Sequence, residues 1–261
     1  MQKEDIKFEN STVLEGMSSL RALLEGKKNG YNDRCILRLL YDEKRADKLC
    51  KELSYLRAMG KVYNFPVLPA SNEEIEALAI GNSHGGLLAE CGVRTLPALC
   101  SASDISPNGF YAMIQGIEDP YNFGYAIRSL YACGVNGIIL SERNWLSAAG
   151  VVARSSAGAS EMLPVYVSDP LLAADFFHEQ GYTVTCADER TEHLLHKTPL
   201  KKPILLIVGG ERRGISRALL DKADLLVKIG YGREFKASLS AASATTMMAY
   251  EIFRQNCDEK G

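Results

Sequence analysis

The sequence predicts an α/β protein with a mostly parallel sheet, preceded by a smaller α/β domain. From residue 108 onward, short apolar segments alternate with segments of helical periodicity, which is typical of a parallel sheet covered by helices on both faces. The stretch 96–107 contains prolines and several serines and is a candidate linker. With 261 residues, the chain has room for one large domain or two small ones.

The composition excludes several classes of protein. The chain is 46% hydrophobic and 24% charged, unlike a disordered, collagen-like or disulfide-rich chain. Its 7 cysteines are widely spaced with no CxxC pair, so free thiols are expected rather than zinc ligands or disulfides. No apolar run approaches the ~18 residues of a membrane span, and the charged N-terminus shows no secretory signal. We therefore expect a cytoplasmic protein with no metal and no membrane partner.

In the N-terminal part, helices alternate with short extended segments. Glu15 follows Thr12 at the spacing of a capping box, and Ser71 is a suitable N-cap for a later helix with an acidic first turn. Helices are expected over residues 11–26, 44–60 and 71–80. Extended segments are expected over 35–42 and 61–70, and a glycine-containing turn leads into a further strand over 82–92.

Beyond the candidate linker, strands and helices alternate regularly. The apolar runs predict strands over 110–117, 135–140, 163–167, 182–188, 203–210 and 224–229. The helical periodicity predicts helices over 121–134, 144–158, 171–181, 215–222 and 242–255. In an open α/β sheet the ligand site lies in the turns that follow the strands, so these turns are the first place to look for chemistry.

The first such turn leads into a helix that carries Arg128. The residues at helical spacing from Phe123 to Tyr131 form one apolar stripe, and Asn122 is the expected N-cap. Arg128 lies about 120° from the centre of the stripe at ~100° per residue, so its side chain points away from the core. It is either a solvated helix arginine or a group that reaches a ligand.

Two later turns are rich in glycine. Gly209 and Gly210 end an apolar strand, and the missing Cβ atoms would let a ligand approach the main chain. Neither a Walker loop nor a GxGxxG dinucleotide loop fits this spacing. The next turn, IGYGREFKASLS, contains cations and leads into a helix start of small residues. The alternative interpretation of these small residues is that they let the helix pack closely against a neighbouring segment.

Together these turns resemble the motifs of the SpoU (TrmH) family of RNA ribose methyltransferases, within the SPOUT superfamily. NFGYAIRSLYACG is similar to the first motif, IVGGERRGIS to the second and SLSAASATTMMAYE to the third. RSSAGASEMLPV resembles a Ser-Ala-Gly-Ala segment that the family carries between the first two motifs. VLEG and HGGLLAEC are similar to the family's small N-terminal domain, so the resemblance spans nearly the whole chain.

The resemblance implies a fold and a function. It implies an RNA substrate-binding domain over 1–95, a linker over 96–107 and a methyltransferase domain over 108–261 whose parallel sheet contains a trefoil knot. It implies S-adenosylmethionine as cofactor, a homodimer with the site completed across the interface, and 2′-O-methylation of RNA. The extra N-terminal domain favours ribosomal over transfer RNA.

The resemblance also implies roles for individual residues. Arg128 would be the main catalytic residue, acting first as an anchor for phosphate and oxyanion because a guanidinium stays protonated. Asn122 and Glu211 would orient it, and Ser238 would place a hydroxyl near the target oxygen. The cofactor would be bound largely by main-chain groups of Ala187, Val208, Gly209, Gly210, Ile229, Gly230 and Leu239. Candidate phosphate contacts, with solvated charges as the alternative, are Lys27, Lys28, Arg34, Arg38, Arg143 and Arg154.

The chain departs from the family pattern in the third motif. Ser240 stands where the family has Asn, Ala242 where it has Ser, and IGYG replaces Ile-Pro-Met. Loss of the amide keeps open a catalytically inactive RNA-binding protein with the same fold. A nucleotide-binding enzyme such as a dehydrogenase is a weaker alternative, because the turn EDPYNFG has a single glycine.

Overall fold

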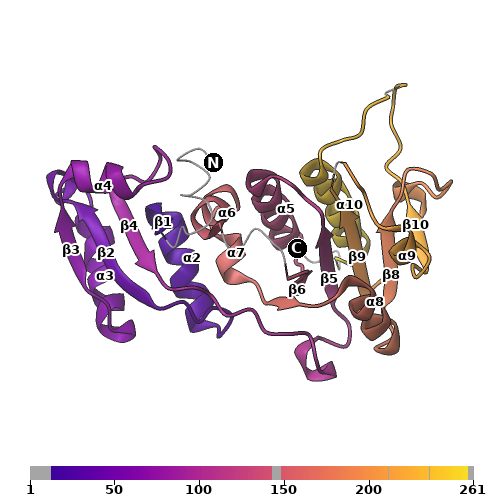
Figure 1. Cartoon of the computed structure of the whole chain (residues 1–261), viewed down its shortest axis with the longest axis horizontal. Coiled ribbons are helices and arrows are strands. Elements are labelled where there is room, and N and C mark those ends of the chain that lie inside the picture. Colours follow the sequence, from indigo (N-terminus) through magenta and orange to yellow (C-terminus); the bar gives the residue numbers. More distant parts are fainter. Residues whose placement is uncertain (1–12, 143–147, 211, 235, 258–261) are drawn as a thin grey trace. The chain divides into compact units, whose positions relative to one another are not determined.

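A computed structural model describes residues 13–142, 148–210, 212–234 and 236–257 (Figure 1). The chain divides into two compact units. The first, here unit 1, comprises residues 1–95 and 145–162, and unit 2 comprises 96–144 and 163–261. In the described part of the chain, no helix is long and apolar enough to cross a membrane.

Unit 1 is built on a four-stranded sheet with the order β1-β4-β2-β3. β4 is antiparallel to β1 and β2, whereas β3 is parallel to β2. One core contains Leu23 and Leu56 from helices α2 and α3, and a second contains Ile75 of α4 with Leu40 and Leu88. The strands are β1 (Val13–Glu15), β2 (Ile36–Asp42), β3 (Val67–Ala70) and β4 (Leu87–Cys91). The helices are α2 (Gly16–Lys28), α3 (Cys50–Tyr63), α4 (Asn72–Leu78), α6 (Ala149–Ser155) and α7 (Ala159–Met162), with a 3₁₀ turn η1 (Glu43–Arg45).

The two predicted caps in unit 1 have different outcomes. The Ser71 cap is confirmed: its Oγ accepts a hydrogen bond from Glu74 N at 3.2 Å, and the Glu74 carboxylate accepts one from Ser71 N at 2.8 Å. The capping role of Glu15 is wrong, because Glu15 ends strand β1 and is itself the residue before α2. Its carboxylate instead accepts hydrogen bonds from the main-chain nitrogens of Ile80 and Gly81.

Residues 148–162 fold with unit 1, although they follow β6 of unit 2 in the sequence. The helix predicted over 144–158 is present as the shorter α6, which is followed by α7; both helices pack within unit 1, against β1 and α2 (Figure 1). Residues 144–147 lie outside the described part. Gly26 permits the close approach of α2 and α7, since a Cβ there would lie 1.9 Å from the carbonyl oxygen of Glu161.

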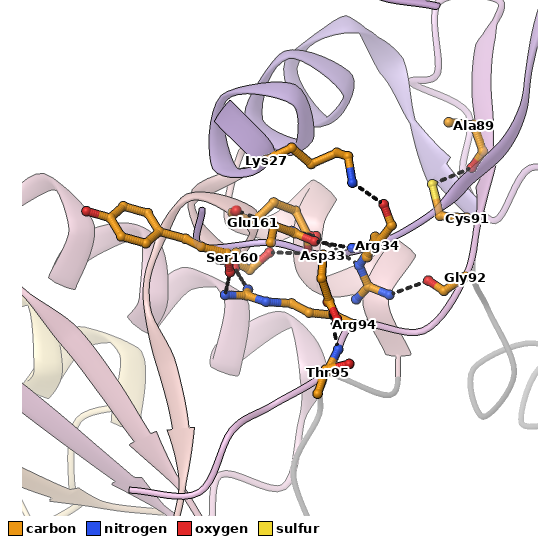
Figure 2. A network of polar contacts seen from close by, with 12 residues as sticks. Lys27, Asp33, Arg34, Ala89, Cys91, Gly92, Arg94, Thr95, Ser160 and Glu161 are labelled. Atoms are coloured by element: carbon orange, nitrogen blue, oxygen red, sulfur yellow. Dashed lines mark hydrogen bonds and ion pairs between the residues drawn. The ribbon is translucent and has the colours of Figure 1, made fainter. Parts of the chain in front are cut away.

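A buried polar network fixes this segment in unit 1 (Figure 2). The fully buried Glu161 carboxylate accepts hydrogen bonds from Arg34 Nε at 2.9 Å and from Asn32 Nδ2 at 2.6 Å. Arg94 donates to the carbonyl oxygen of Ser160 at 2.7 Å. Burial by itself raises the pKa of Glu161, but the charges of Arg34 and Arg94 and the hydrogen bonds bring that pKa below its ordinary value.

Unit 2 contains a six-stranded sheet with the order β10-β8-β9-β5-β6-β7, and every pair in it is parallel. The predicted parallel α/β sheet is therefore confirmed, with a strand in each predicted segment. The strands are β5 (Phe110–Gln115), β6 (Gly137–Leu140), β7 (Val165–Val167), β8 (Thr183–Ala187), β9 (Ile204–Gly209) and β10 (Leu225–Val227). The helices are α5 (Pro120–Ala132), α8 (Pro170–Glu179), α9 (Arg217–Leu220) and α10 (Ala241–Asn256), with 3₁₀ turns η2 (Ala102–Asp104) and η4 (Leu195–Lys197).

The helices of unit 2 pack in two groups. Phe177 of α8 and Leu219 of α9 share a core with alternate residues of β9, Leu205 and Ile207. Helices α5 and α10 pack against each other, and α10 also contacts β9.

The predicted N-cap at Asn122 is wrong: α5 begins at Pro120, and the Asp119 carboxylate accepts the hydrogen bond from Asn122 N at 2.8 Å.

The stretch 96–107 takes part in the packing of unit 2. Leu99 N donates to Val167 O at 3.1 Å, and Val167 N donates to Pro97 O at 2.9 Å, so this segment pairs with β7 at the edge of the sheet. A 3₁₀ turn follows at Ala102–Asp104.

Candidate active site at the carboxyl ends of the strands

Unit 2 holds a cavity of about 960 Å³ at the carboxyl ends of neighbouring strands. It is lined by the segments that follow β8, β9 and β10 and by the first turns of α10. Because β8 lies between β9 and β10, the three segments converge at one edge of the sheet. This is where open parallel sheets place their ligands, and the volume suits a molecule of nucleoside size.

Most residues that sequence analysis assigned to the cofactor line this cavity. Val208 does not: it is buried within β9, one residue before the segment that reaches the cavity. The lining positions among the assigned residues are Ala187, Gly209, Gly210, Ile229, Gly230 and Leu239. The structure thus brings together main-chain segments that lie as far apart in the sequence as Ala187 and Leu239.

The glycines after β9 are needed for the packing of the loop itself. A Cβ on Gly210 would lie 1.7 Å from the carbonyl oxygen of Gly116, and one on Gly209 would lie 2.4 Å from the carbonyl carbon of Gly214. Gly214 N donates to Gly210 O at 3.0 Å and closes the loop. The sequence analysis attributed these glycines to ligand approach, whereas the structure shows neighbouring main chain at both Cβ positions.

The four residues expected to act in catalysis are not all at the cavity. Ser238 lines it and is exposed. Asn122 is half-buried in the first turn of α5, and Arg128 is exposed farther along the same helix; neither lines the cavity of its own chain. No described residue forms a hydrogen bond or ion pair with the Arg128 guanidinium, which leaves it available to a ligand. Glu211 lies outside the described residues.

Ser240 has a structural role in the third motif. It is the N-cap of α10, and its Oγ accepts a hydrogen bond from Ser243 N at 3.2 Å. Serine and asparagine are both strong N-caps, so this substitution keeps the helix start while removing the amide. Ala242 is buried at 8% exposure.

Sequence analysis missed several charged groups around the cavity. Asp188 and Arg190, after β8, form a bidentate pair at 3.0 and 2.8 Å. The hydrogen bond from Arg190 is the largest cause of a lowered pKa at Asp188. Arg212 and Arg213 also line the cavity, and the Nε of Arg212 lies 3.3 Å from the Glu118 carboxylate. The available signal was position alone: each of these residues follows a predicted strand at the same edge.

Most of the candidate phosphate contacts in unit 1 are already paired within the protein. Arg34 is 2% exposed and paired with Glu161, so its interpretation as an RNA contact is wrong. Arg38 pairs with Glu90 at 2.8 Å and Arg154 with Glu15 at 3.4 Å. Lys27 donates to the carbonyl oxygen of Arg34 at 2.7 Å, whereas Lys28 remains exposed. Arg143 lies outside the described residues.

Comparison with known proteins decides the family. The model of the SpoU rRNA Methylase family matches residues 109–250. The chain belongs to the SpoU family. The match includes α5 and most of α10, so the expected first and second motifs of the SpoU family fall within it, as does the third up to Tyr250.

Curated relatives extend the comparison. A putative TrmH family tRNA/rRNA methyltransferase of Staphylococcus haemolyticus is 32% identical over 144 residues, which are 55% of this chain and 57% of the relative. The match thus spans little more than half the length of that relative. The 23S rRNA (guanosine-2′-O-)-methyltransferase RlmB of Shewanella oneidensis is 25% identical over 262 residues, covering 98% of this chain and 99% of the relative.

Solved structures share the fold. An rRNA methyltransferase from Sinorhizobium meliloti superimposes with a TM-score of 0.76 at 21% identity, covering 98% of this chain and 92% of the other. The SpoU methyltransferase AviRb from Streptomyces viridochromogenes, in complex with AdoMet, gives a TM-score of 0.74 at 20% identity, covering 98% and 94%.

Proposed function

We propose that this SpoU-family protein is an S-adenosylmethionine-dependent RNA (ribose-2′-O-)methyltransferase. The observation that carries the proposal is the cavity at the carboxyl ends of β8, β9 and β10, lined by the turns of the second and third motifs. RlmB, which matches nearly the full chain, is named as a 23S rRNA methyltransferase. We therefore favour ribosomal over transfer RNA as substrate, and the cytoplasm as the place where that substrate is met.

The cavity fits the proposed cofactor. Leu194, Val227 and Met248 contribute apolar surface suited to a purine ring. Gly210 and Gly230 line the cavity, so their main chain can offer hydrogen-bonding groups to the cofactor. When bound, S-adenosylmethionine supplies a methyl group on a sulfonium sulfur, an activated donor with a neutral leaving group.

Residues of the chain would then position the RNA. The Ser238 hydroxyl, at the cavity, would contact the ribose 2′-oxygen. Arg128 would hold the adjacent phosphate and stabilise negative charge on the attacking oxygen, because a guanidinium is charged at all working pH values and offers donors in a fixed fork. Asn122 and Glu211 would orient the Arg128 side chain. Holding the reacting groups in line and excluding water would supply most of the acceleration.

We infer that a second copy of the chain covers α5 and α10. Along these two packed helices lie exposed apolar side chains, including Tyr125 at 48%, Tyr250 at 57% and Phe253 at 42%. Contiguous exposed apolar surface of this kind marks a protein interface. Arg128 lies on α5 beside this surface but does not line its own cavity, so the dimer would bring it to the partner's site.

The proposal includes the trefoil knot and the N-terminal RNA-binding domain. The chain order supports the knot: β10 lies at the edge of the sheet, yet the following helix α10 packs on β9 and α5 in its interior. Between β10 and α10, residues 228–231 and 238–239 line the same cavity as Gly209 and Gly210 at the end of β9. Residues 1–95 are proposed as the RNA-binding domain and 108–261 as the methyltransferase domain, joined by 96–107, with residues 148–162 of the second stretch folded into unit 1.

A non-catalytic RNA-binding protein with the same fold is the alternative function. Ser240 and Ala242, in place of the family's Asn and Ser, favour it, whereas the N-cap hydrogen bond of Ser240 shows that the helix start is preserved.

The two functions are separated by one experiment. Purified protein is titrated with S-adenosylmethionine in a calorimeter and then incubated with labelled cofactor and RNA from cells that lack the protein. The proposal predicts donor binding and label on a ribose 2′-oxygen, mapped by mass spectrometry. Binding without transfer supports the alternative, and no binding contradicts both the proposed activity and the assignment of the cavity.

A further inference from the structure

Tyr231 is an aromatic residue at the opening of the cavity that the proposed mechanism does not use. Its side chain lines the cavity and is 45% exposed. Leu239 N donates a hydrogen bond to Tyr231 Oη at 3.3 Å, which ties the ring across the base of the loop 231–239. The residue after Leu239 is the cap of α10, and the residue before it is Ser238. The ring is therefore held next to the proposed position of the reacting ribose.

Tyr231 lies between two glycines, and the space is open beside Gly232 only, because a Cβ on Gly230 would lie 3.0 Å from Leu194 Cδ2. Gly232 would have no neighbour within 4 Å of an added Cβ. Gly230 is exposed and lines the cavity as well. A partly exposed aromatic ring that is held by a hydrogen bond offers a surface on which an unpaired nucleobase can stack.

Arg213 supplies a cation that lines the same cavity. It lies in the loop closed by the hydrogen bond between Gly214 and Gly210, and it lines the cavity. The neighbouring Arg212 pairs with Glu118, and Arg217 pairs with Asp221 at 2.9 Å. Arg213, by contrast, is exposed and forms no hydrogen bond or ion pair with any described residue. Of these three cavity arginines it is the one whose charge is not already matched by a carboxylate.

We propose that Tyr231 and Arg213 form a nucleotide platform, in which the ring of Tyr231 stacks on an unpaired base of the RNA and Arg213 binds a backbone phosphate beside it. The inference rests on the proposed function and names the form of its substrate: a nucleotide extruded from an RNA helix or lying in a loop. Stacking accepts any base, so the platform would hold the target nucleotide while leaving choice of sequence to contacts elsewhere.

The variants that test the platform are Tyr231→Ala and Arg213→Gln, with Tyr231→Phe and Arg212→Gln as matched controls. Methyl transfer is measured at saturating S-adenosylmethionine with RNA varied, RNA binding is measured without cofactor across a salt series, and cofactor affinity is measured by calorimetry. Tyr231→Ala should raise the KM for RNA roughly tenfold, the order of one lost base–aromatic stack. Tyr231→Phe should stay within about threefold of wild type because the stacking face remains.

Arg213→Gln should reduce the slope of log affinity against log salt by about one, the value for one lost phosphate contact, whereas Arg212→Gln should leave it unchanged. Cofactor affinity should be the same in all four variants. An unchanged KM in Tyr231→Ala, or equal slope changes in the two arginine variants, overturns the platform. A loss of cofactor affinity in Arg213→Gln also overturns it, since Arg213 would then bind the carboxylate of the cofactor. If wild-type protein transfers no methyl group, the proposed function fails, while the cofactor-free RNA-binding comparison still tests the platform.

Discussion

Arg34 Nε lies 2.9 Å from Glu161 Oε2, and both side chains are almost fully removed from solvent, at 3% and 0% exposure. The two residues are separated by 127 positions in the sequence. Through this pair, a segment that follows β6 of the methyltransferase sheet is fixed to the small N-terminal sheet. The pair is therefore part of the core of unit 1, and its loss should destabilise unit 1 before unit 2.

Glu161→Gln should destabilise unit 1 by about 3–5 kcal/mol, because it leaves the Arg34 guanidinium buried without its counter-charge. Chemical unfolding followed by hydrogen exchange, which resolves the two units, measures the effect. The matched control is Arg38→Gln in the exposed pair with Glu90, where the cost should be below about 1 kcal/mol. Equal costs in the two variants would show that the buried network contributes no more than a surface pair.

The stability that Glu161 contributes should depend on pH. Its pKa in the folded protein lies below the ordinary value of 4.5, so this contribution is complete above pH 4.5 and is lost as pH falls through the folded-state pKa. The difference in unfolding free energy between wild type and Glu161→Gln should thus be constant at neutral pH and shrink below about pH 4.5. If the difference in unfolding free energy instead grows as the pH falls, the pKa of Glu161 is not lowered in the folded protein.

Gly210→Ala should weaken cofactor binding at least tenfold. The added Cβ would meet the carbonyl oxygen of Gly116 at 1.7 Å, so the loop after β9 must shift. Gly232→Ala is the control, because its Cβ would enter open space. Calorimetry with S-adenosylmethionine should show at least a tenfold loss of affinity for the first variant, of the order expected when main-chain contacts of a preorganised loop are displaced, and none for the second. Normal binding by Gly210→Ala would mean that this loop does not hold the cofactor.

Tyr250→Glu should convert the proposed dimer to a monomer, since a charge would be buried in the apolar face of α5 and α10. Tyr55→Glu, at a tyrosine of unit 1 that is 39% exposed, is the matched control. Sedimentation gives the mass of each variant. If Tyr250→Glu keeps the wild-type mass, this face is not the interface; if it becomes a monomer but methylates normally, Arg128 acts within its own chain.

The parallel sheet was accessible from sequence because each buried strand is a continuous apolar run bounded by turn residues, as in β9 (Ile204–Gly209). The strand ends also predicted that a ligand site lies in the turns that follow them, whereas the individual cofactor positions came from the family resemblance. What sequence could not supply were partners distant along the chain. In the sequence, Arg34 cannot be told apart from a solvated surface arginine. Only the fold places Glu161 beside it. Glu15 matches a local capping box, but its carboxylate is used by Ile80 and Gly81.

Methyl transfer to RNA by the wild type and by Arg128→Ala, at a concentration of labelled S-adenosylmethionine that saturates both proteins, tests the central claim most directly. The Arg128 side chain is exposed and forms no hydrogen bond or ion pair with a described residue, so its loss should spare folding and change cofactor affinity by no more than severalfold. The account predicts label on a ribose 2′-oxygen with the wild type and background transfer with the variant. Wild-type transfer rates in Arg128→Ala, or a wild-type protein that binds the cofactor and methylates no RNA, would contradict it.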